Sequence, residues 1–250
     1  MIDIITENNI KIIMNIELIL FDLDDTLMAF DIVSNEAWDK AVNEFIRCNN
    51  INIEKNILLE KIHKTRKWYW SDPERHKIGR KNIINARREI VKSALNEFNF
   101  EINLLENFAD NYSNIHETLW YLFDDVSETL QKIKDMNIKI GVMTNGTSES
   151  QRKKMKRFDI EKYFDYVFVE GEVGYGKPDI RMYEHMLKTT NTANEKIIMV
   201  GDNLVWDIDP PNKLGIYTIW INKKRLNLQD FNIKPMKIID NISEIIEILK

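Results

Sequence analysis

The segment that most constrains this chain is an apolar run that ends abruptly in carboxylates. Residues 19–21 read Ile-Leu-Phe, and Asp22 and Asp24 follow, two positions apart. In an extended segment this spacing points both side chains to the same face. Because open α/β sheets place their active sites at the carboxyl ends of strands, the pair indicates metal-assisted chemistry there. An Asp-rich turn after a strand would give the same pattern, so this run alone leaves both interpretations open.

A second apolar segment also ends in polar residues. Residues 138–143 form a mainly apolar run, and Thr144, Asn145 and Gly146 follow it. A hydroxyl and turn amides at a strand end can donate hydrogen bonds to phosphate oxygens, especially where the next helix presents its N-terminus. Thr-Asn-Gly is also an ordinary turn sequence, so this motif is weak on its own.

A glycine-rich loop carries a lysine. Within residues 171–179, GEVGYGKPD, the spacing of Gly171, Gly176 and Lys177 fits a phosphate-binding P-loop. Pro178 stands where that motif needs Ser or Thr for magnesium, so we reject the P-loop interpretation. A lysine on such a loop, followed by a proline that restricts the backbone, instead predicts a fixed cation that neutralises an anion. A solvent-exposed loop lysine is the alternative.

A further strand of the buried type is expected over residues 196–200, and it runs into Gly201 and Asp202, with Asp207 five residues later. Aspartates at a strand end suit Mg²⁺, which takes few protein oxygens, keeps waters and leaves room for a substrate phosphate. Asp207 could ligate the ion directly, act through a water, or cap the following helix. The sequence leaves these three roles open.

Together and in this order, the four segments resemble the haloacid dehalogenase-like hydrolase superfamily. The resemblance extends from about Ile16 to about Trp220. Four ordered matches at strand ends are far more specific than any one of them. The corresponding motif positions are Asp22, Asp24 and Thr26, then Thr144, then Lys177, then Gly201, Asp202 and Asp207.

The resemblance implies a two-step phosphatase mechanism. Asp22 would be the nucleophile that forms an aspartyl-phosphate, and Asp24 would act first as general acid and then as general base. Thr144 and the Asn145 amide would hold phosphate oxygens, and Lys177 would neutralise the nucleophile and the transferring group.

The resemblance also implies a magnesium site and a further substrate-binding residue. Mg²⁺ would sit on Asp22, the backbone carbonyl of Asp24, and Asp202, with Asp207 bound directly or through water. Thr26 is expected among the substrate-binding residues, together with Thr144, Asn145 and Lys177.

Asp24 separates the two chemistries for which the superfamily is known. The 2-haloacid dehalogenase branch resembles this pattern but lacks the second aspartate and needs no metal, so phosphatase is favoured over dehalogenase. The fourth motif departs from the usual pattern, because Pro210 and Pro211 stand close after Asp207 where many relatives read Gly-Ala. Since proline is tolerated in the first turn of a helix, the pair predicts a helix start.

Predicted strands and helices alternate along the second half of the chain. Helices are expected over 127–136, 148–157, 180–189 and from about 243, and strands over 139–143, 166–169, 196–200 and 216–221. Such alternation predicts an α/β fold with a doubly wound, mostly parallel Rossmann-like sheet. We expect residues 1–27 and 125–250 to form this catalytic core, with residues 1–13 an N-terminal extension that could reflect a misassigned start codon.

Residues 28–124 show a different pattern, with helical spacing, almost no glycine and one proline, Pro73. An insertion here resembles the family's all-helical cap domain, which closes over the site, excludes water and contributes substrate contacts. Residues 66–70, Arg-Lys-Trp-Tyr-Trp, could stack a nucleobase, although we favour packing of these aromatics inside the helical bundle. Cations that could pair with a substrate phosphate or carboxylate follow at Arg80, Lys81, Arg87 and Arg88.

Residues 144–179 look most like the branch of the family that contains pyrimidine 5′-nucleotidases and acylneuraminate-9-phosphatases. The resemblance implies a small phosphorylated metabolite as the partner, with a nucleoside 5′-monophosphate as the first expectation and a sugar phosphate or phosphoglycolate-type molecule as the alternative. A noncatalytic binding or regulatory module and a phosphotransferase with an acceptor other than water are hypotheses of other classes.

Composition restricts the remaining possibilities. The net charge of −5 and the isoelectric point of about 5.6 offer no basic surface for nucleic acid. No segment approaches the roughly 20 apolar residues of a membrane span, and the N-terminus has no convincing signal-peptide core. The single cysteine, Cys48, excludes an internal disulfide. We therefore expect a cytoplasmic protein with no nucleic-acid or membrane partner, whose oligomeric state the sequence leaves open.

Overall fold

The computed structural model describes residues 15–228 and 231–250, and the expected extension at residues 1–13 lies outside them. Six parallel strands form one sheet in the order β5-β4-β1-β6-β7-β8. Their bounds are β1 Leu18–Phe21, β4 Lys139–Thr144, β5 Tyr166–Val169, β6 Ile197–Gly201, β7 Tyr217–Ile221 and β8 Lys237–Ile239. The predicted parallel α/β sheet is confirmed.

β1 lies in the middle of the sheet, and all four of its residues are buried. A continuous apolar strand of this kind is typical of a parallel sheet that is covered on both faces. Phe21 pairs with Val142 of β4 on one side and with Val200 of β6 on the other. This register brings the carboxyl ends of three neighbouring strands to one edge, where the polar residues follow.

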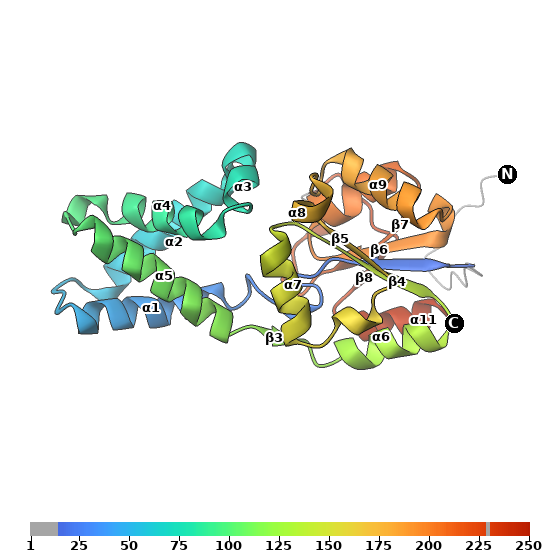
Figure 1. Cartoon of the computed structure of the whole chain (residues 1–250), viewed down its shortest axis with the longest axis horizontal. Helices are drawn as coiled ribbons and strands as arrows, with labels where there is room; N and C mark the ends of the chain where they lie inside the picture. Colours follow the sequence, from blue (N-terminus) through green and yellow to red (C-terminus); the bar gives the residue numbers. More distant parts are fainter. Residues whose placement is uncertain (1–14, 229–230) are drawn as a thin grey trace.

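Helices cover both faces of the sheet, as a doubly wound fold requires. Figure 1 shows α9 on one side of the sheet and α6 and α11 on the other. Alternate residues of β1 point to the two faces, since Leu18 packs in one apolar cluster with Met182 and Ile19 packs in another with Leu130. The helices of this part are α6 Val126–Asp135, α7 Ser148–Arg157, α8 Glu170–Val173, α9 Ile180–Thr190, α10 Asp209–Lys213 and α11 Ile245–Ile248.

Most element bounds lie within one or two residues of the sequence prediction, which is the usual uncertainty of helix and strand ends. The helix over 148–157 matches α7, and the two prolines occupy the first turn of α10, as predicted. The edge strand β8 was not predicted. Near residue 243, a short 3₁₀ turn precedes α11, so the last helix begins slightly later than expected.

A bundle of helices is inserted between β1 and α6. The chain leaves and returns through a two-stranded antiparallel pair, β2 Met28–Ala29 and β3 Tyr121–Leu122. Figure 1 shows the bundle beside the sheet, connected to it by these strands. Its helices are α1 Ser34–Cys48, α2 Lys55–Ser71, α3 Pro73–Gly79, α4 Ile83–Ala94 and α5 Ile102–Thr118.

The bundle has an apolar core of its own. Trp38 of α1 is fully buried, and its ring stacks on Tyr112 of α5 with a centroid separation of 3.5 Å. Pro73 occupies the first turn of α3, where Asp72 caps the helix by accepting a hydrogen bond from the Arg75 amide. Burial of aromatic side chains at helical spacing is what stabilises such a bundle.

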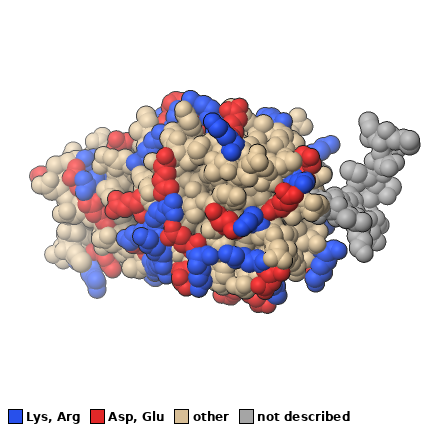
Figure 2. All heavy atoms as spheres, turned by 45° about the vertical axis from the view of Figure 1, so that its right-hand side comes forward, with Lys and Arg blue, Asp and Glu red and all other residues tan. Residues whose placement is uncertain are grey.

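The surface carries charges of both signs. On the face drawn in Figure 2, basic and acidic side chains are interspersed, and neither sign forms a continuous field. Within residues 15–228 and 231–250, no helix combines the length and the apolar character needed to span a bilayer.

Candidate active site

The predicted site residues gather at the carboxyl edge of the sheet. Asp22 directly follows β1, Thr144 ends β4 and Asp202 directly follows β6. The Asp22 amide still donates to the Val200 carbonyl at 2.9 Å, so the sheet itself fixes where this carboxylate starts. A cavity of about 1010 Å³ opens over this edge, and its lining includes Asp22, Asp24, Thr144, Asn145, Lys177, Asp202 and Asp207.

Lys177 is the cation at the centre of this edge. Its Nζ donates to Asp22 Oδ1 and to Asp207 Oδ1, both at 2.6 Å, and the residue is 1% exposed. Burial lowers the pKa of Lys177, but Asp207 and Asp22 outweigh it and hold that pKa above its usual value. The alternative of a solvent-exposed loop lysine is therefore wrong.

Asn145 holds the loop that carries Lys177. Its Oδ1 accepts from the Lys177 amide and its Nδ2 donates to the Lys177 carbonyl, both at 2.7 Å. The side chain of the second motif thus positions the lysine of the third. Binding of phosphate oxygens by the Asn145 backbone amide and the Thr144 hydroxyl stays a prediction.

Three carboxylates form a cluster that fits a hard cation. Oxygen atoms of Asp22, Asp202 and Asp207 lie within 4.8 Å of one another. Burial raises the pKa of Asp22 to about 7 against the opposing charge of Lys177, and burial together with Asp22 and Asp207 raises the pKa of Asp202 well above its usual value. Lys177, and Lys224 at 3.7 Å from Asp202, thus compensate these charges incompletely, and a bound divalent cation would favour their ionised forms.

Asp207 does not cap the helix that follows it, because Ile208 occupies the N-cap position of α10. Its Oδ2 instead accepts from the Asn203 amide at 3.0 Å, and its Oδ1 accepts from Lys177. Of the three roles left open by the sequence, the capping role is excluded, and metal ligation stays a prediction.

Thr26 lies behind the nucleophile candidate and is fully buried. Its hydroxyl donates to Asp22 Oδ2 at 3.2 Å and accepts from the Asp202 amide at 3.1 Å. These contacts orient Asp22 and tie the turns after β1 and β6 together. Substrate contact by Thr26 stays a prediction, since its hydroxyl is engaged within the protein.

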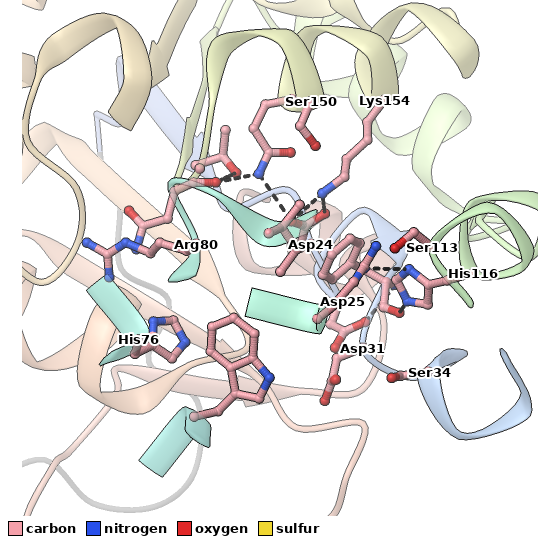
Figure 3. A pocket seen from close by; sticks show the side chains of 18 of the residues that line it. Asp24, Asp25, Asp31, Ser34, His76, Arg80, Ser113, His116, Ser150 and Lys154 are labelled. Carbon is pink, nitrogen blue, oxygen red and sulfur yellow. Dashed lines mark hydrogen bonds and ion pairs between the residues drawn. The ribbon is translucent and has the colours of Figure 1, made fainter. Parts of the chain in front are cut away.

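Asp24 is held by a lysine that the sequence did not point to. Lys154 of α7 donates from Nζ to both carboxylate oxygens of Asp24 at 2.7 Å, and Gln151 Nε2 lies 3.3 Å from Asp24 Oδ2. Figure 3 shows Lys154 extending from its helix toward Asp24. Burial lowers the pKa of Lys154, and Asp24 opposes that shift. The signal that could have pointed to Lys154 was its position on α7, the helix that begins just after the second motif.

The basic and aromatic run of α2 is divided between three environments. Tyr69 packs inside the bundle as predicted, but Trp68 is 54% exposed, so packing of Trp68 in the core is wrong. The Arg75 guanidinium lies over its ring instead, 4.0 Å from the centroid. The cavity lining on this side includes Arg66, Lys67, Trp70, His76, Arg80, Lys81 and Arg87.

Arg87 and His116 form a polar pair deep in the bundle wall of the cavity. Arg87 Nη2 lies 3.1 Å from His116 Nδ1, while His116 Nε2 lies 2.8 Å from the Phe30 carbonyl. This arrangement requires a neutral imidazole that carries its proton on Nε2. Burial and the charge of Arg87 lower the pKa of His116 to about 3, which agrees with that state. By contrast, the neighbouring Arg88 is paired with Asp110.

Comparison with known proteins identifies the family. The model of the haloacid dehalogenase-like hydrolases matches residues 16–215. The chain belongs to this family. The resemblance drawn from the four motifs is thereby confirmed.

Two related proteins of named activity align with most of this hydrolase. A glyceraldehyde 3-phosphate phosphatase from Methanocaldococcus jannaschii is 29% identical over 93% of this chain and 96% of its own length. The pyrimidine 5′-nucleotidase PynA from Streptococcus pneumoniae is 27% identical over 83% of this chain and 84% of its own length.

A solved structure shares the fold. The HAD hydrolase YfnB from Bacillus subtilis superimposes with a TM-score of 0.72 at 20% identity, covering 94% of this chain and 99% of that one. Its structure is described with bound magnesium and as revealing interdomain movement.

Proposed function

We propose that this hydrolase is a Mg²⁺-dependent phosphomonoesterase that acts on a small phosphorylated metabolite through an aspartyl-phosphate at Asp22. The observation that carries the proposal is the buried bridge of Lys177 between Asp22 and Asp207, beside the three-carboxylate cluster. The proposal is supported because this arrangement would provide a nucleophile, a fixed cation and a hard-metal site around one point of the cavity. Phosphoryl transfer needs these parts to orient and neutralise its transition state.

The first half-reaction forms the bond between Asp22 and phosphorus while the bond to the leaving oxygen breaks. Thr144 and the Asn145 amide donate to the oxygens of the transferring group, and Lys177 neutralises the charge it shares with the nucleophile. Asp24 delivers a proton to the leaving oxygen. In the second half-reaction, Asp24 takes a proton from the water that attacks phosphorus and releases Asp22.

Asp22, Asp202 and Asp207 would hold magnesium, together with the Asp24 carbonyl that the family resemblance implies, and the ion would supply charge neutralisation. The YfnB structure with bound magnesium supports this choice of ion. Hydrogen bonds from Thr26 to Asp22, and from the Asp202 amide to Thr26, keep two of these carboxyl-bearing turns together.

We propose that residues 28–124 act as a cap over a core made of residues 1–27 and 125–250. Support comes from contacts between the bundle and the sheet edge. The His76 ring lies 4.7 Å from the Trp206 ring, and Arg80 pairs with Glu170. By bringing the bundle against the sheet edge, such contacts would limit the access of water, and a drier cavity would strengthen the electrostatic interactions inside it.

For the substrate, a nucleoside 5′-monophosphate remains our first candidate, supported by the size of the cavity and by the relative PynA. In the part of the chain that the structure describes, Arg87 forms no ion pair with a carboxylate, although it is 9% exposed and lines the cavity. Its free donors suit carbonyl oxygens of a base, and Trp70 on the same wall offers a stacking face.

A sugar phosphate, in particular a triose phosphate, is the second candidate. It is favoured by the glyceraldehyde 3-phosphate phosphatase, which matches more of the chain than PynA does. The catalytic residues would serve either substrate equally, because they contact only the phosphate and the leaving oxygen. The choice therefore depends on the cap.

The proposal is tested by measuring phosphate release from a panel of pyrimidine and purine 5′-monophosphates, triose and hexose phosphates and phosphoglycolate. The assay is run with Mg²⁺ and again with chelator, and alcohols are added to detect transfer to acceptors other than water. Phosphate release that chelator abolishes would support a Mg²⁺-dependent phosphatase. A preference of tenfold or more in kcat/KM for one class of compound would identify its substrate class. No release from any compound by folded protein that binds Mg²⁺ contradicts the proposal and favours a noncatalytic module.

A further inference from the structure

A buried lysine outside the four motifs contacts the acid–base candidate. Lys154 is 1% exposed, and its Nζ lies 2.7 Å from each carboxylate oxygen of Asp24. No other carboxylate forms an ion pair with Lys154 in the part of the chain that the structure describes. Burying a cation without a partner costs much free energy, so the charge of Lys154 depends on the carboxylate of Asp24 for compensation.

Aromatic rings enclose the other side of the same ammonium group. Nζ lies 3.8 Å from the centroid of Phe30 and 5.3 Å from that of Trp120. Both rings belong to the segments that connect the sheet to the helical bundle. Attraction between a cation and the aromatic faces holds Nζ in place from behind, while its hydrogens point to Asp24.

Asp24 is restrained from a second direction by the same helix. Gln151 Nε2 donates to Asp24 Oδ2 and also to the Asn145 carbonyl. Gln151 and Lys154 are three residues apart on α7, so they lie on one face of that helix. The carboxylate is thus fixed by two donors whose own positions are set by packing.

We propose that Lys154 is a positioning residue for the acid–base step, which holds the Asp24 carboxylate where it exchanges a proton with the leaving oxygen and with the attacking water. The inference rests on the proposed phosphatase function. An aspartate on a turn has free side-chain rotations, and an acid that is misplaced by about 1 Å loses much of its effect. Without Lys154, Asp24 would be restrained by Gln151 alone.

The expected signature is a dependence on the leaving group. A phenolate such as p-nitrophenolate departs without a proton, whereas an alkoxide such as that from glycerol needs one. kcat/KM reports the first phosphoryl transfer, in which Asp24 acts as acid, so the ratio of kcat/KM for the two compounds isolates this role. A general loss of folding or of metal binding lowers both values together and leaves their ratio unchanged.

The experiment compares Lys154→Met, Lys154→Arg and Asp24→Asn with p-nitrophenyl phosphate and glycerol 2-phosphate. The matched control is Lys156→Met, which removes an exposed lysine from the same helix. Loss of Lys154 should lower kcat/KM on glycerol 2-phosphate by about a hundredfold, within the range of acid–base catalysis, and change it only a few fold on p-nitrophenyl phosphate. Asp24→Asn should show the same split, Lys154→Arg a smaller one, and Lys156→Met none.

Two results would overturn the inference. An equal loss on both phosphate esters would mean that Lys154 serves folding or metal binding in general, and unchanged kinetics would mean that Asp24 needs no such support. Either result requires an active wild-type enzyme, so it differs from failure of the proposed function, in which the wild-type protein releases no phosphate from either compound.

Discussion

Arg80, just after α3, forms a two-pronged ion pair with Glu170 of α8, with nitrogen–oxygen distances of 2.8 and 2.9 Å. Glu170 is buried and also accepts from the Gly146 amide at 3.0 Å, in the turn that follows Thr144. One carboxylate therefore connects the helical bundle with the turn of the second motif, which is proposed to bind phosphate. A bidentate arginine–carboxylate pair with low exposure is the strong form of this interaction.

Loss of this pair should weaken the contact between the bundle and the sheet edge. Arg80→Gln removes the cation and leaves Glu170 buried with the Gly146 amide, so we expect kcat/KM to fall about tenfold, the equivalent of about 1.4 kcal/mol. Steady-state kinetics on the preferred substrate measure the change. The matched control is Lys81→Gln, since Lys81 is half exposed and lies 3.9 Å from the same carboxylate. Equal effects of the two variants would show that the pair has no special role.

Arg87 should determine substrate preference without contributing to the chemical step. In Arg87→Gln we expect KM for the preferred substrate to rise about tenfold, while kcat and the activity on p-nitrophenyl phosphate change little. Arg88→Gln is the control, because Arg88 is the next residue on α4 and pairs with Asp110 instead of lining the cavity. A fall in kcat with unchanged KM would place Arg87 in the catalytic machinery and contradict this assignment.

His116 should make stability sensitive to mild acid. Its pKa is about 3 in the folded protein because burial and Arg87 disfavour the charged form, whereas an unfolded chain titrates near 6.5. Between these values the unfolded state binds more protons, so the free energy of unfolding falls as pH decreases, by up to about 1.4 kcal/mol per pH unit. Above about pH 6.5 this contribution is fully retained.

The comparison of wild type with His116→Gln tests this dependence, since a glutamine can still accept a hydrogen bond from Arg87. We expect the free energy of unfolding, measured with denaturant, to fall less between pH 7 and pH 5 in the variant than in wild type. In both proteins the lowered pKa of His76, about 4, adds a slope of the same sign, whereas the raised pKa of Asp22, about 7, adds a slope of the opposite sign, so the test is the difference between the two curves. Parallel curves for the two proteins would show that His116 titrates normally in the folded state.

The sequence predicted the core of this hydrolase well because its signals are local. Apolar strands that end in Asp22, Thr144 and Asp202 define the sheet edge without reference to anything distant. The strand β8 escaped prediction because it has only three residues, two of them exposed. Its existence depends on pairing with β7, which no local pattern reveals.

The partners of the site residues were not predictable in the same way. Lys154 meets Asp24 across 130 residues, and Arg80 meets Glu170 across 90. In the sequence these two cations look like any others in a chain that is rich in lysine and arginine. Only the folded arrangement separates them from Arg88, which forms an ordinary surface pair. For the same reason Thr26 could be placed in its motif, but its position behind Asp22 could not be foreseen.

The most direct test of the account is phosphate release by wild type and by Asp22→Asn under identical Mg²⁺ concentrations, with bound Mg²⁺ and unfolding measured for both. Asparagine preserves the shape of the side chain but cannot attack phosphorus. We predict that the variant stays folded and loses turnover on the order of a thousandfold or more. Turnover of the folded variant within tenfold of the wild type would contradict an aspartyl-phosphate at Asp22 and with it the central claim.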